Sequence, residues 1–275
     1  MYIEVGPAGI DISAERNEKQ YEIKKERLET FVKNILVDIR ECLPVLKQKA
    51  YKIKNVLHLP EIARKMVEAV KMVDEATLTP MAAVAGAVSD AMKEYLKRED
   101  LDFITVNNGG DISVFNLSGK PLRIGIGDIR TGSVTPYIVK IEGLKDYGFA
   151  TSGYGGRSFT LGLADICTVL AENGAIADAA ATFICNQTNV ESGQIVRRKA
   201  CEIDPLTDIP DEFVTVSIGN LDKGLIEKAL HNGITVAEKL KKDNVIYDVI
   251  ILLKGNIVTT MCGDKNISLE VNHGH

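Results

Sequence analysis

The sequence predicts an α+β fold built on an antiparallel β-sheet. Helical patterns fill most of the first 100 residues and short β-like runs begin at residue 102, so the two kinds of element are segregated rather than alternating. At 275 residues, of which 45% are hydrophobic, the chain can bury a sizeable core. No linker or low-complexity segment divides it, and we therefore expect one domain over residues 1–275.

Three helices are predicted before the β-like region, after an N-terminal strand or hairpin. Apolar residues spaced three and four apart mark an amphipathic helix over residues 28–43, and Pro44 should end or kink it. A second helix is predicted over residues 60–73, because its first residue is a proline and its apolar residues keep the helical period. The third should begin at Pro80, with Thr79 as its capping residue.

The rest of the chain is predicted to hold most of the strands and two further helices. Early strands are short runs bounded by Gly, Asn and Asp, namely "FITV", "DISVF", "LRIGI" and "PYIVKI". A helix is predicted over Ala175–Cys185, opened by a turn at Asn173-Gly174, because alanine is the best helix former. The later elements are strands near "QIVRRKACEI" and "FVTVSI", a helix over Leu221–Lys242, and a closing hairpin that turns at Gly255-Asn256.

Charge and composition exclude several classes of partner. The net charge is −5, from 33 basic and 38 acidic residues, and the basic residues lie in short mixed runs typical of solvated helix faces. Aromatic residues make up 5%, Trp is absent, and no basic stripe suits nucleic acid. No signal-like N-terminus or membrane-length apolar stretch is present, so we expect a cytoplasmic protein that does not bind membranes.

The cysteines and histidines do not form a metal-binding pattern. Five cysteines without C-x-x-C spacing favour free thiols over disulfides and argue against a zinc site. The four histidines never pair at metal-ligand spacing. The cysteines are Cys42, Cys167, Cys185, Cys201 and Cys262.

Two oxygen-bearing side chains interrupt the alanine-rich helix. Asp178 and Thr182 are four residues apart, so they share one stripe of the helix, and the small neighbours let a backbone, a phosphate or an ion come close. A structural alternative is that Asp178 stabilises the dipole of the helix from its first turn. The run "TPMAAVAGAVSDAM" is equally small and apolar, which predicts a second closely approached helix.

Two glycine-containing segments are candidates for ligand binding. In "VNNGGDI", Gly109 and Gly110 can adopt positive φ and expose bare backbone to a ligand, with Asp111 beside them; a simple hairpin turn is the alternative. In "FATSGYGGRSFTLG", glycines and hydroxyls surround Arg157 and could wrap a phosphate; the alternative is a surface loop. The hydroxyls of this segment belong to Thr151, Ser152, Ser158 and Thr160.

A third segment adds carboxylates that could hold a cation. Asp165 lies between apolar residues, which places it either on the solvated side of a strand or in the core with a partner. Carboxylate, hydroxyl and carbonyl oxygens are the ligands that Mg²⁺ takes, usually together with substrate phosphates. A phosphate loop and a metal ion would therefore support each other.

The order of these segments resembles that of a known family. The run "TPMAAVAGAVSDAM", then "NNGGDI", then "ATSGYGGRSFTLGLADICTVLAENGAIADAAATFICN" is similar to the ApbE-like family, the small cytoplasmic relatives of the FAD:protein FMN transferase ApbE. The resemblance covers most of residues 60–190. It implies the T-fold, an antiparallel sheet with helices packed on one face, in agreement with the segregated pattern.

The resemblance also implies roles for particular residues. In the transferases the "GGD" turn lines the flavin nucleotide site, the "TSG" segment follows it, and the Asp and Thr of an "AD-x-x-AT" helix bind Mg²⁺. Asp165 or Asp178 would then be the candidate catalytic base. The implied metal ligands are Asp178 and Thr182, and the implied FAD or FMN contacts, with neighbours from the two loops, are Asn108, Gly109, Gly110, Asp111, Thr151, Ser152, Gly153, Arg157 and Ser158.

This sequence departs from the transferase pattern at one important segment. Transferases carry "H-x-x-D-P-x-T-G" between the "TSG" loop and the metal helix, whereas "RSFTLGLAD" stands here and contains no histidine. The similar "CEIDPLTDIP" follows the helix and lacks both the histidine and the glycine. Close relatives also have Glu where Asn107 stands. These differences argue against retained FMN transfer.

Three functions are compatible with these patterns. The first is a flavin or nucleotide site in which Mg²⁺ neutralises the pyrophosphate. The second is an enzyme of sulfur metabolism that forms homocysteine from aspartate semialdehyde, as relatives in anaerobes suggest, in which Cys167 and Cys185 would matter; their apolar surroundings favour inert thiols. The third is a non-catalytic binding module, expected to be a homo-oligomer as T-fold proteins commonly are.

Overall fold

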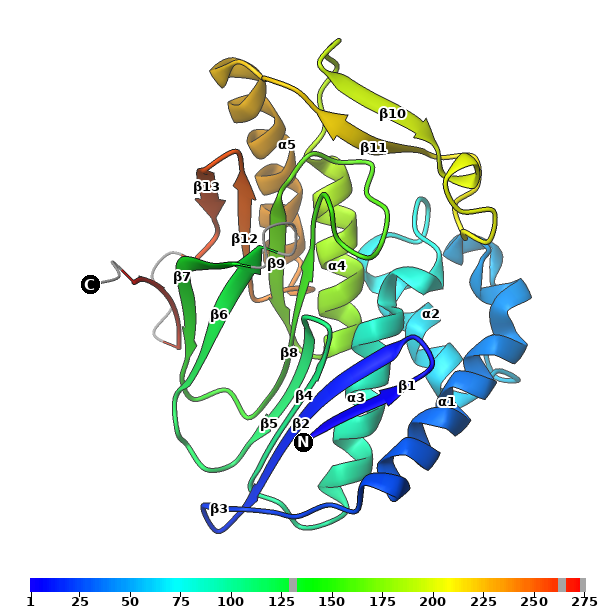
Figure 1. Cartoon of the computed structure of the whole chain (residues 1–275), viewed down its shortest axis with the longest axis vertical. Coiled ribbons are helices and arrows are strands. Elements are labelled where there is room, and N and C mark those ends of the chain that lie inside the picture. The colour runs from blue at the N-terminus through cyan, green and yellow to red at the C-terminus, as the bar shows by residue number, and fades with distance from the viewer. Residues whose placement is uncertain (129–132, 262–265, 273–275) are drawn as a thin grey trace. The chain divides into compact units, whose positions relative to one another are not determined.

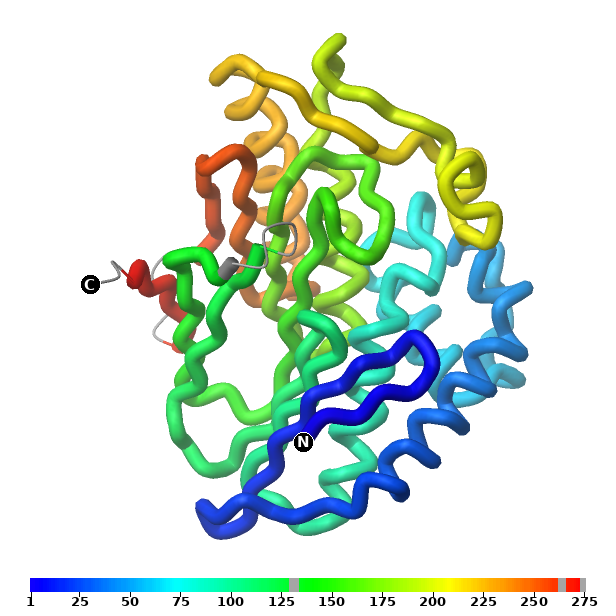
Figure 2. Tube along the Cα trace, in the orientation of Figure 1, coloured from blue at the N-terminus to red at the C-terminus, as the bar shows by residue number. Residues whose placement is uncertain are grey.

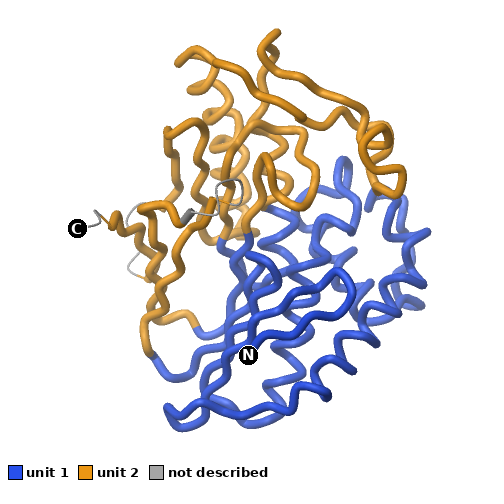
Figure 3. Tube along the Cα trace, viewed as in Figure 1, with its two compact units in different colours: residues 1–119, 145–150, 170–180 blue, residues 120–144, 151–169, 181–275 orange. Residues whose placement is uncertain are grey.

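The chain divides into two compact units, each made of several segments. The computed structural model describes residues 1–128, 133–261 and 266–272, and its trace can be followed in Figure 2. Figure 3 colours the two units separately. The first unit holds residues 1–119, 145–150 and 170–180; the second holds residues 120–144, 151–169 and 181–275. The expectation of a single domain stays a prediction.

Three α-helices belong to the first unit, and each forms close to where the sequence predicts it. They are α1 (Lys25–Leu46), α2 (Glu61–Asp74) and α3 (Val84–Lys97). Helix α1 continues past Pro44 and ends at Leu46. A short 3₁₀ helix, Pro80–Ala83, precedes α3, so the α-helix begins later than Thr79.

The strands of the first unit form an antiparallel sheet in the order β1-β2-β4-β5-β8, with the short β3 paired to β2. Helix α3 packs against β4 and β5, and α1 packs against β1; Figure 1 shows α3 behind the strands and α1 beside β1. The strands are β1 (Tyr2–Val5), β2 (Ala8–Arg16), β3 (Lys19–Gln20), β4 (Phe103–Asn108), β5 (Asp111–Asn116) and the first part of β8 (Asp146–Ser152).

Burial alternates along β4 in step with the pleat of the sheet. Ile104, Val106 and Asn108 are buried, whereas the residues between them are partly exposed. Ser113 of β5 lies opposite Val106, and its hydroxyl reaches a side chain of α3. Since neighbouring side chains on a strand point to opposite faces, the helices of this unit cover the face that carries these residues.

The second unit contains the rest of the strands. A three-stranded antiparallel sheet has the order β14-β7-β6, a two-stranded ribbon pairs β10 with β11, and β9, β12 and β13 lie in that hydrogen-bonded order. The strands are β6 (Leu122–Asp128), β7 (Ser133–Ile141), β9 (Ile166–Ala171), β10 (Ile195–Lys199), β11 (Phe213–Ile218), β12 (Asp248–Leu253), β13 (Asn256–Thr259) and β14 (Ile267–Val271).

Two helices complete the chain. Helix α4 (Gly174–Gln187) carries the alanine-rich run and contributes residues to both units, and α5 (Lys223–Lys242) packs against β12 and β13. Asp222 caps α5 by accepting a hydrogen bond from the Leu225 backbone N–H. No helix within the described ranges is both long and apolar enough to cross a lipid bilayer.

The α+β prediction is confirmed, with four local differences. Strand β8 runs through Thr151 and Ser152, which the sequence places in a loop, and β9 was not predicted. Strand β14 was also missed. The last hairpin turns at Lys254-Gly255 rather than Gly255-Asn256, since Asn256 already belongs to β13. Both residues of that turn have positive φ, which explains the glycine.

Candidate functional site

The "NNGGD" segment forms a tight hairpin between β4 and β5. Gly109 and Gly110 have φ values of +68° and +108°, so the predicted positive φ is confirmed at both glycines. Asn108 and Asp111 pair across the turn, and each is more than nine-tenths buried. The Gly110 N–H donates to the side-chain oxygen of Asn107 at 2.8 Å. The turn is therefore fixed by its own side chains.

Asp178 binds the N-terminus of helix α3. Its Oδ2 atom accepts hydrogen bonds from the backbone N–H groups of Ala85 at 3.1 Å and Gly86 at 3.0 Å. Asn108 donates to the Ala85 carbonyl at 3.4 Å. The first unit thus brings two of the predicted site residues, Asn108 and Asp178, to the start of one helix.

The capping prediction for Thr79 is wrong, and the position of Asp178 supplies the reason. Thr79 precedes the 3₁₀ turn and its side chain makes no capping hydrogen bond. The N-terminal donors of α3 are satisfied by a carboxylate from a remote helix instead. A carboxylate there also complements the positive end of the helix dipole. The structural alternative for Asp178 is therefore wrong as stated, because Asp178 lies beyond the first turn of α4 and the helix that it stabilises is α3.

Two glycines allow this close contact between α3, α4 and the sheet. A methyl group added to Gly86 would lie 2.1 Å from the Gly174 carbonyl oxygen. One added to Gly148 of β8 would lie 2.1 Å from the Asn173 carbonyl carbon. Both distances are far below a van der Waals contact, so a side chain fits at neither position. The small residues predicted to allow a close approach are therefore in contact with the backbone of another segment.

Helix α4 presents Asp178 and Thr182 on one stripe, and both are half-buried. The alanines around them, Ala177, Ala179, Ala180 and Ala181, are fully buried. Hydrogen bonds that orient a carboxylate through one oxygen are common around metal ligands, so the contacts of Asp178 fit a Mg²⁺ role. In the described ranges no group of three or more His, Cys, Asp or Glu could hold a metal ion. Water molecules and phosphate oxygens of a bound ligand would supply the rest of the coordination.

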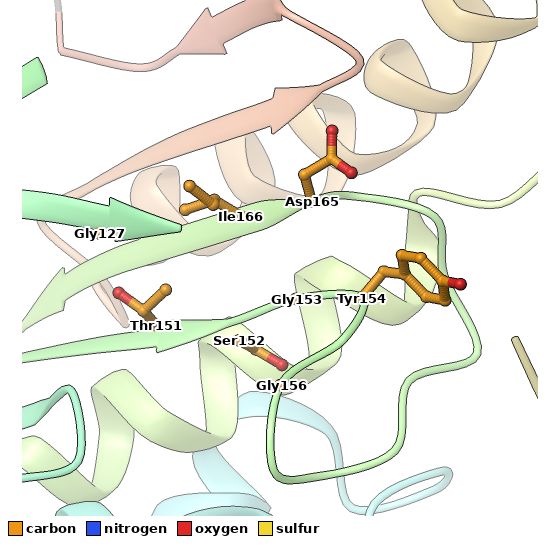
Figure 4. A pocket seen from close by; sticks show the side chains of 8 residues that line it. All are labelled: Gly127, Thr151, Ser152, Gly153, Tyr154, Gly156, Asp165 and Ile166. Atoms are coloured by element: carbon orange, nitrogen blue, oxygen red, sulfur yellow. The ribbon is translucent and has the colours of Figure 1, made fainter. Parts of the chain in front are cut away.

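The second unit holds a small polar hollow at the predicted "TSG" segment (Figure 4). Thr151 and Ser152 come from the end of β8, Gly153 follows them, and Asp165 immediately precedes β9. The cavity measures about 10 Å³, which is room for a single water molecule. Its lining residues are Gly127, Thr151, Ser152, Gly153, Tyr154, Gly156, Asp165 and Ile166.

Backbone contacts fix the shape of this hollow. Asp165 Oδ2 accepts a hydrogen bond from the Lys254 N–H at 2.6 Å. The Tyr154 N–H donates to the Ala164 carbonyl at 2.7 Å. A methyl group on Gly153 would lie 2.2 Å from the Asp165 carbonyl oxygen, so only glycine fits between the two strands. The hollow brings together four predicted site residues, Thr151 to Gly153 and Asp165.

The arginine and the later hydroxyls of the glycine-rich loop lie outside the hollow. Arg157 and Ser158 are exposed and do not line it. Thr160 is buried and contacts the Cys185 sulfur at 3.3 Å and the Asn186 side chain at 3.2 Å, which ties the end of the loop to α4. The roles of Arg157 and Ser158 in cofactor binding stay predictions.

The described cysteines carry free thiols, as predicted, and two of them are fully buried near each other. Burial raises the pKa of Cys185 to about 11, and burial followed by the nearby Cys185 raises the pKa of Cys167 well above its usual value. Since the thiolate is the reactive form, these thiols should be inert. The sulfur-chemistry alternative gains no support from them. Cys262 lies outside the described residues.

We expect the buried thiols to resist alkylation and to make the free energy of unfolding depend on pH at high pH. Iodoacetamide at pH 8 should label the half-buried Cys201 and spare Cys167 and Cys185 in native protein, as peptide mass spectrometry would show.

The unfolded chain loses the Cys185 proton near pH 9.0, whereas the folded chain keeps it to about pH 11. The free energy of unfolding should therefore fall as pH rises through this window. A Cys185→Ala variant with an unchanged slope would contradict the expectation.

Sequence reasoning missed Asp90, although the sequence carries a signal for it. Asp90 is a carboxylate inside an apolar helical run, and it is only 7% exposed. Buried charges are rare unless they are paired and hydrogen-bonded. Its partners lie where two small-residue helices come close together. The sequence predicts that these helices are closely approached, but it does not show which residues meet there.

Comparisons with known proteins identify the family. A family model described as "AbpE bacteria" matches residues 1–259. A UPF0280 protein of Methanospirillum hungatei is 32% identical over 147 residues, which cover 53% of this chain and 58% of that protein. A UPF0280 protein of Methanocaldococcus jannaschii is 36% identical over 162 residues, covering 57% and 63%. The chain thus spans less than two thirds of the length of these relatives.

A solved structure shares the fold. The flavin transferase ApbE from Vibrio cholerae, in a mutant form, has a TM-score of 0.50 and 13% identity, over 99% of this chain and 96% of that one. This likeness concerns the fold alone. Since the family model covers nearly the whole sequence, the chain belongs to the ApbE-like family that this model describes.

Proposed function

We propose that this protein binds a flavin nucleotide, FAD or FMN, together with Mg²⁺. The observation that carries the proposal is the polar hollow around Thr151, Ser152 and Gly153, which lies at the "TSG" segment, the one that follows the flavin-lining "GGD" turn in the transferases this chain resembles. The shared fold with a flavin transferase agrees with it.

The side chains that line the hollow are better suited to the flavin ring than to the phosphates of the ligand. A carboxylate repels phosphate but accepts a hydrogen bond from an N–H group. Asp165 lines the hollow, so we propose that the hollow receives the imide N–H of the flavin ring. The small cavity takes only the edge of the ring.

Asp178 and Thr182 would hold Mg²⁺ jointly with ligand phosphates. When bound, the ion would neutralise the negative charge of the pyrophosphate. The chain's own contribution is to fix the Asp178 carboxylate through two backbone N–H groups before the ligand arrives. The segment that carries the histidine in transferases is absent, so we propose binding without transfer of FMN. Catalytic roles for Asp165 and Asp178 stay predictions.

Isothermal titration of wild type and Asp165→Asn with FAD, FMN and ADP tests the placement of the ring. The asparagine keeps the shape but replaces an accepting oxygen by a donating N–H₂, so we expect FAD and FMN to bind at least about tenfold more weakly. ADP lacks the flavin ring, so whatever affinity it has should stay unchanged. Asp211→Asn is a matched control on a side chain that is 91% exposed. Equal flavin affinities in wild type and Asp165→Asn would contradict the placement, and no flavin binding by wild type would contradict the function.

A further inference from the structure

Helices α3 and α4 cap each other: a carboxylate of each helix accepts hydrogen bonds from backbone N–H groups at the N-terminus of the other. Asp178 of α4 accepts from the Ala85 and Gly86 N–H groups of α3. Asp90 of α3 accepts from the Gly174 N–H at Oδ1 and the Ala175 N–H at Oδ2 of α4, both at 2.8 Å. Each helix therefore carries the cap of the other.

Asp90 satisfies two of the backbone N–H groups at the start of α4. The first four N–H groups of a helix have no partner within the helix. Asp90 takes those of Gly174 and Ala175. The Asn173 side chain accepts from Ile176 at 2.9 Å, and the Asn173 carbonyl accepts the first hydrogen bond of the helix itself, from Ala177 at 3.1 Å. Losing Asp90 would leave two buried donors unsatisfied.

The Asp90 carboxylate is itself held in place from several elements. Ser113 of β5 donates to Oδ1 at 2.6 Å, and the Lys93 ammonium lies 3.9 Å away. Lys93 also pairs with Asp146 of β8, which Lys97 contacts at 2.9 Å. Burial raises the pKa of Asp90, and Lys93, Ser113 and the α4 backbone oppose that shift by stabilising the charged form.

We propose that Asp90 is a positioning residue for the candidate metal ligand Asp178. Asp90 fixes the first turn of α4, and Asp178 lies one turn further along the same helix. Gly86 and Gly174 touch at the crossing, so a small rotation of α4 would move Asp178 away from the α3 donors. The effect on Mg²⁺ rests on the proposed function; the effect on helix geometry does not.

Amide exchange in an Asp90→Asn variant tests the geometric part without any ligand. The asparagine has one accepting oxygen where two are needed, so the Gly174 and Ala175 amides should exchange at least about tenfold faster. The Ala85 and Gly86 amides, which bond Asp178 and not Asp90, should lose protection too. Asp222→Asn changes a cap on α5 and should leave all four amides as in wild type. Unchanged protection at Ala85 and Gly86 would overturn the proposal.

Titration with FAD, with and without Mg²⁺, tests the functional part on the same variant. A positioning role predicts that Asp90→Asn reduces the gain in affinity produced by Mg²⁺ by about tenfold and leaves the Mg²⁺-free affinity unchanged. An equal loss in both conditions would show a general structural role and overturn this part. If wild type binds no flavin, the proposed function fails, and amide exchange alone decides the positioning role. If Asp90→Asn does not fold, Ser113→Ala, which removes one donor to Asp90, carries both measurements with the same expected directions.

Discussion

Replacing Gly86 with alanine is expected to lower the free energy of unfolding by about 3 kcal/mol or more. The added methyl group would lie 2.1 Å from the Gly174 carbonyl oxygen and 2.4 Å from its carbon. These are backbone atoms at the first turn of α4, so no side-chain rotation relieves the overlap. The two helices must separate, and separation breaks the hydrogen bonds that Asp90 and Asp178 make across the contact.

Chemical denaturation of Gly86→Ala and a control variant measures this effect. Gly193→Ala is the matched control, because a methyl group there meets nothing within 4 Å and the residue does not have positive φ. The control should change stability by less than about 1 kcal/mol. If Gly86→Ala were as stable as Gly193→Ala, the close helix contact described above would be wrong.

Asp178→Asn is expected to abolish the Mg²⁺-dependent gain in flavin affinity while leaving the fold intact. Asparagine accepts hydrogen bonds at a helix N-terminus about as well as aspartate, so the contacts with Ala85 and Gly86 can persist and stability should change by less than about 1 kcal/mol. The negative charge that a hard cation needs is lost. We expect FAD affinity in the presence of Mg²⁺ to fall roughly 10- to 100-fold.

Asp178→Ala separates the two roles of this carboxylate. It removes the cap as well as the charge, so it should also destabilise the protein by about 1–2 kcal/mol. Thermal unfolding and flavin titration of both variants, with Asp222→Asn as control, give the comparison. Full Mg²⁺ dependence in Asp178→Asn would show that this residue only caps α3, and the metal proposal would be abandoned.

The sequence predicts the elements of this fold better than their contacts. Helical periodicity places α1, α2 and α5 within a few residues, and alanine content places α4, because these signals are local. Strand β9 was missed, since "ICTVLA" is buried along its whole length and shows no alternation. Thr79 was assigned as a cap because cap rules consider only neighbours in sequence, whereas the donors of α3 bond Asp178, which is 93 residues from Ala85.

In the candidate site, too, local features could be predicted from the sequence and long-range contacts could not. The glycine turn at Gly109-Gly110 follows from local backbone rules, and the resemblance points to Thr151 and Asp178. Asp90 was not predicted, because its partners Gly174 and Ser113 meet it only after β5, α3 and α4 pack together. Non-local hydrogen bonds leave no pattern in a single sequence beyond an unexpected carboxylate in an apolar run.

The central claim is that this ApbE-like protein binds a flavin nucleotide with the help of Mg²⁺, and one calorimetric measurement tests it most directly. Wild-type protein is titrated with FAD in buffer containing Mg²⁺ and again in buffer containing EDTA. We predict saturable binding at one site per chain that is at least about tenfold tighter with Mg²⁺. Absence of binding in both buffers would contradict the claim, and equal affinity in both would contradict its metal component.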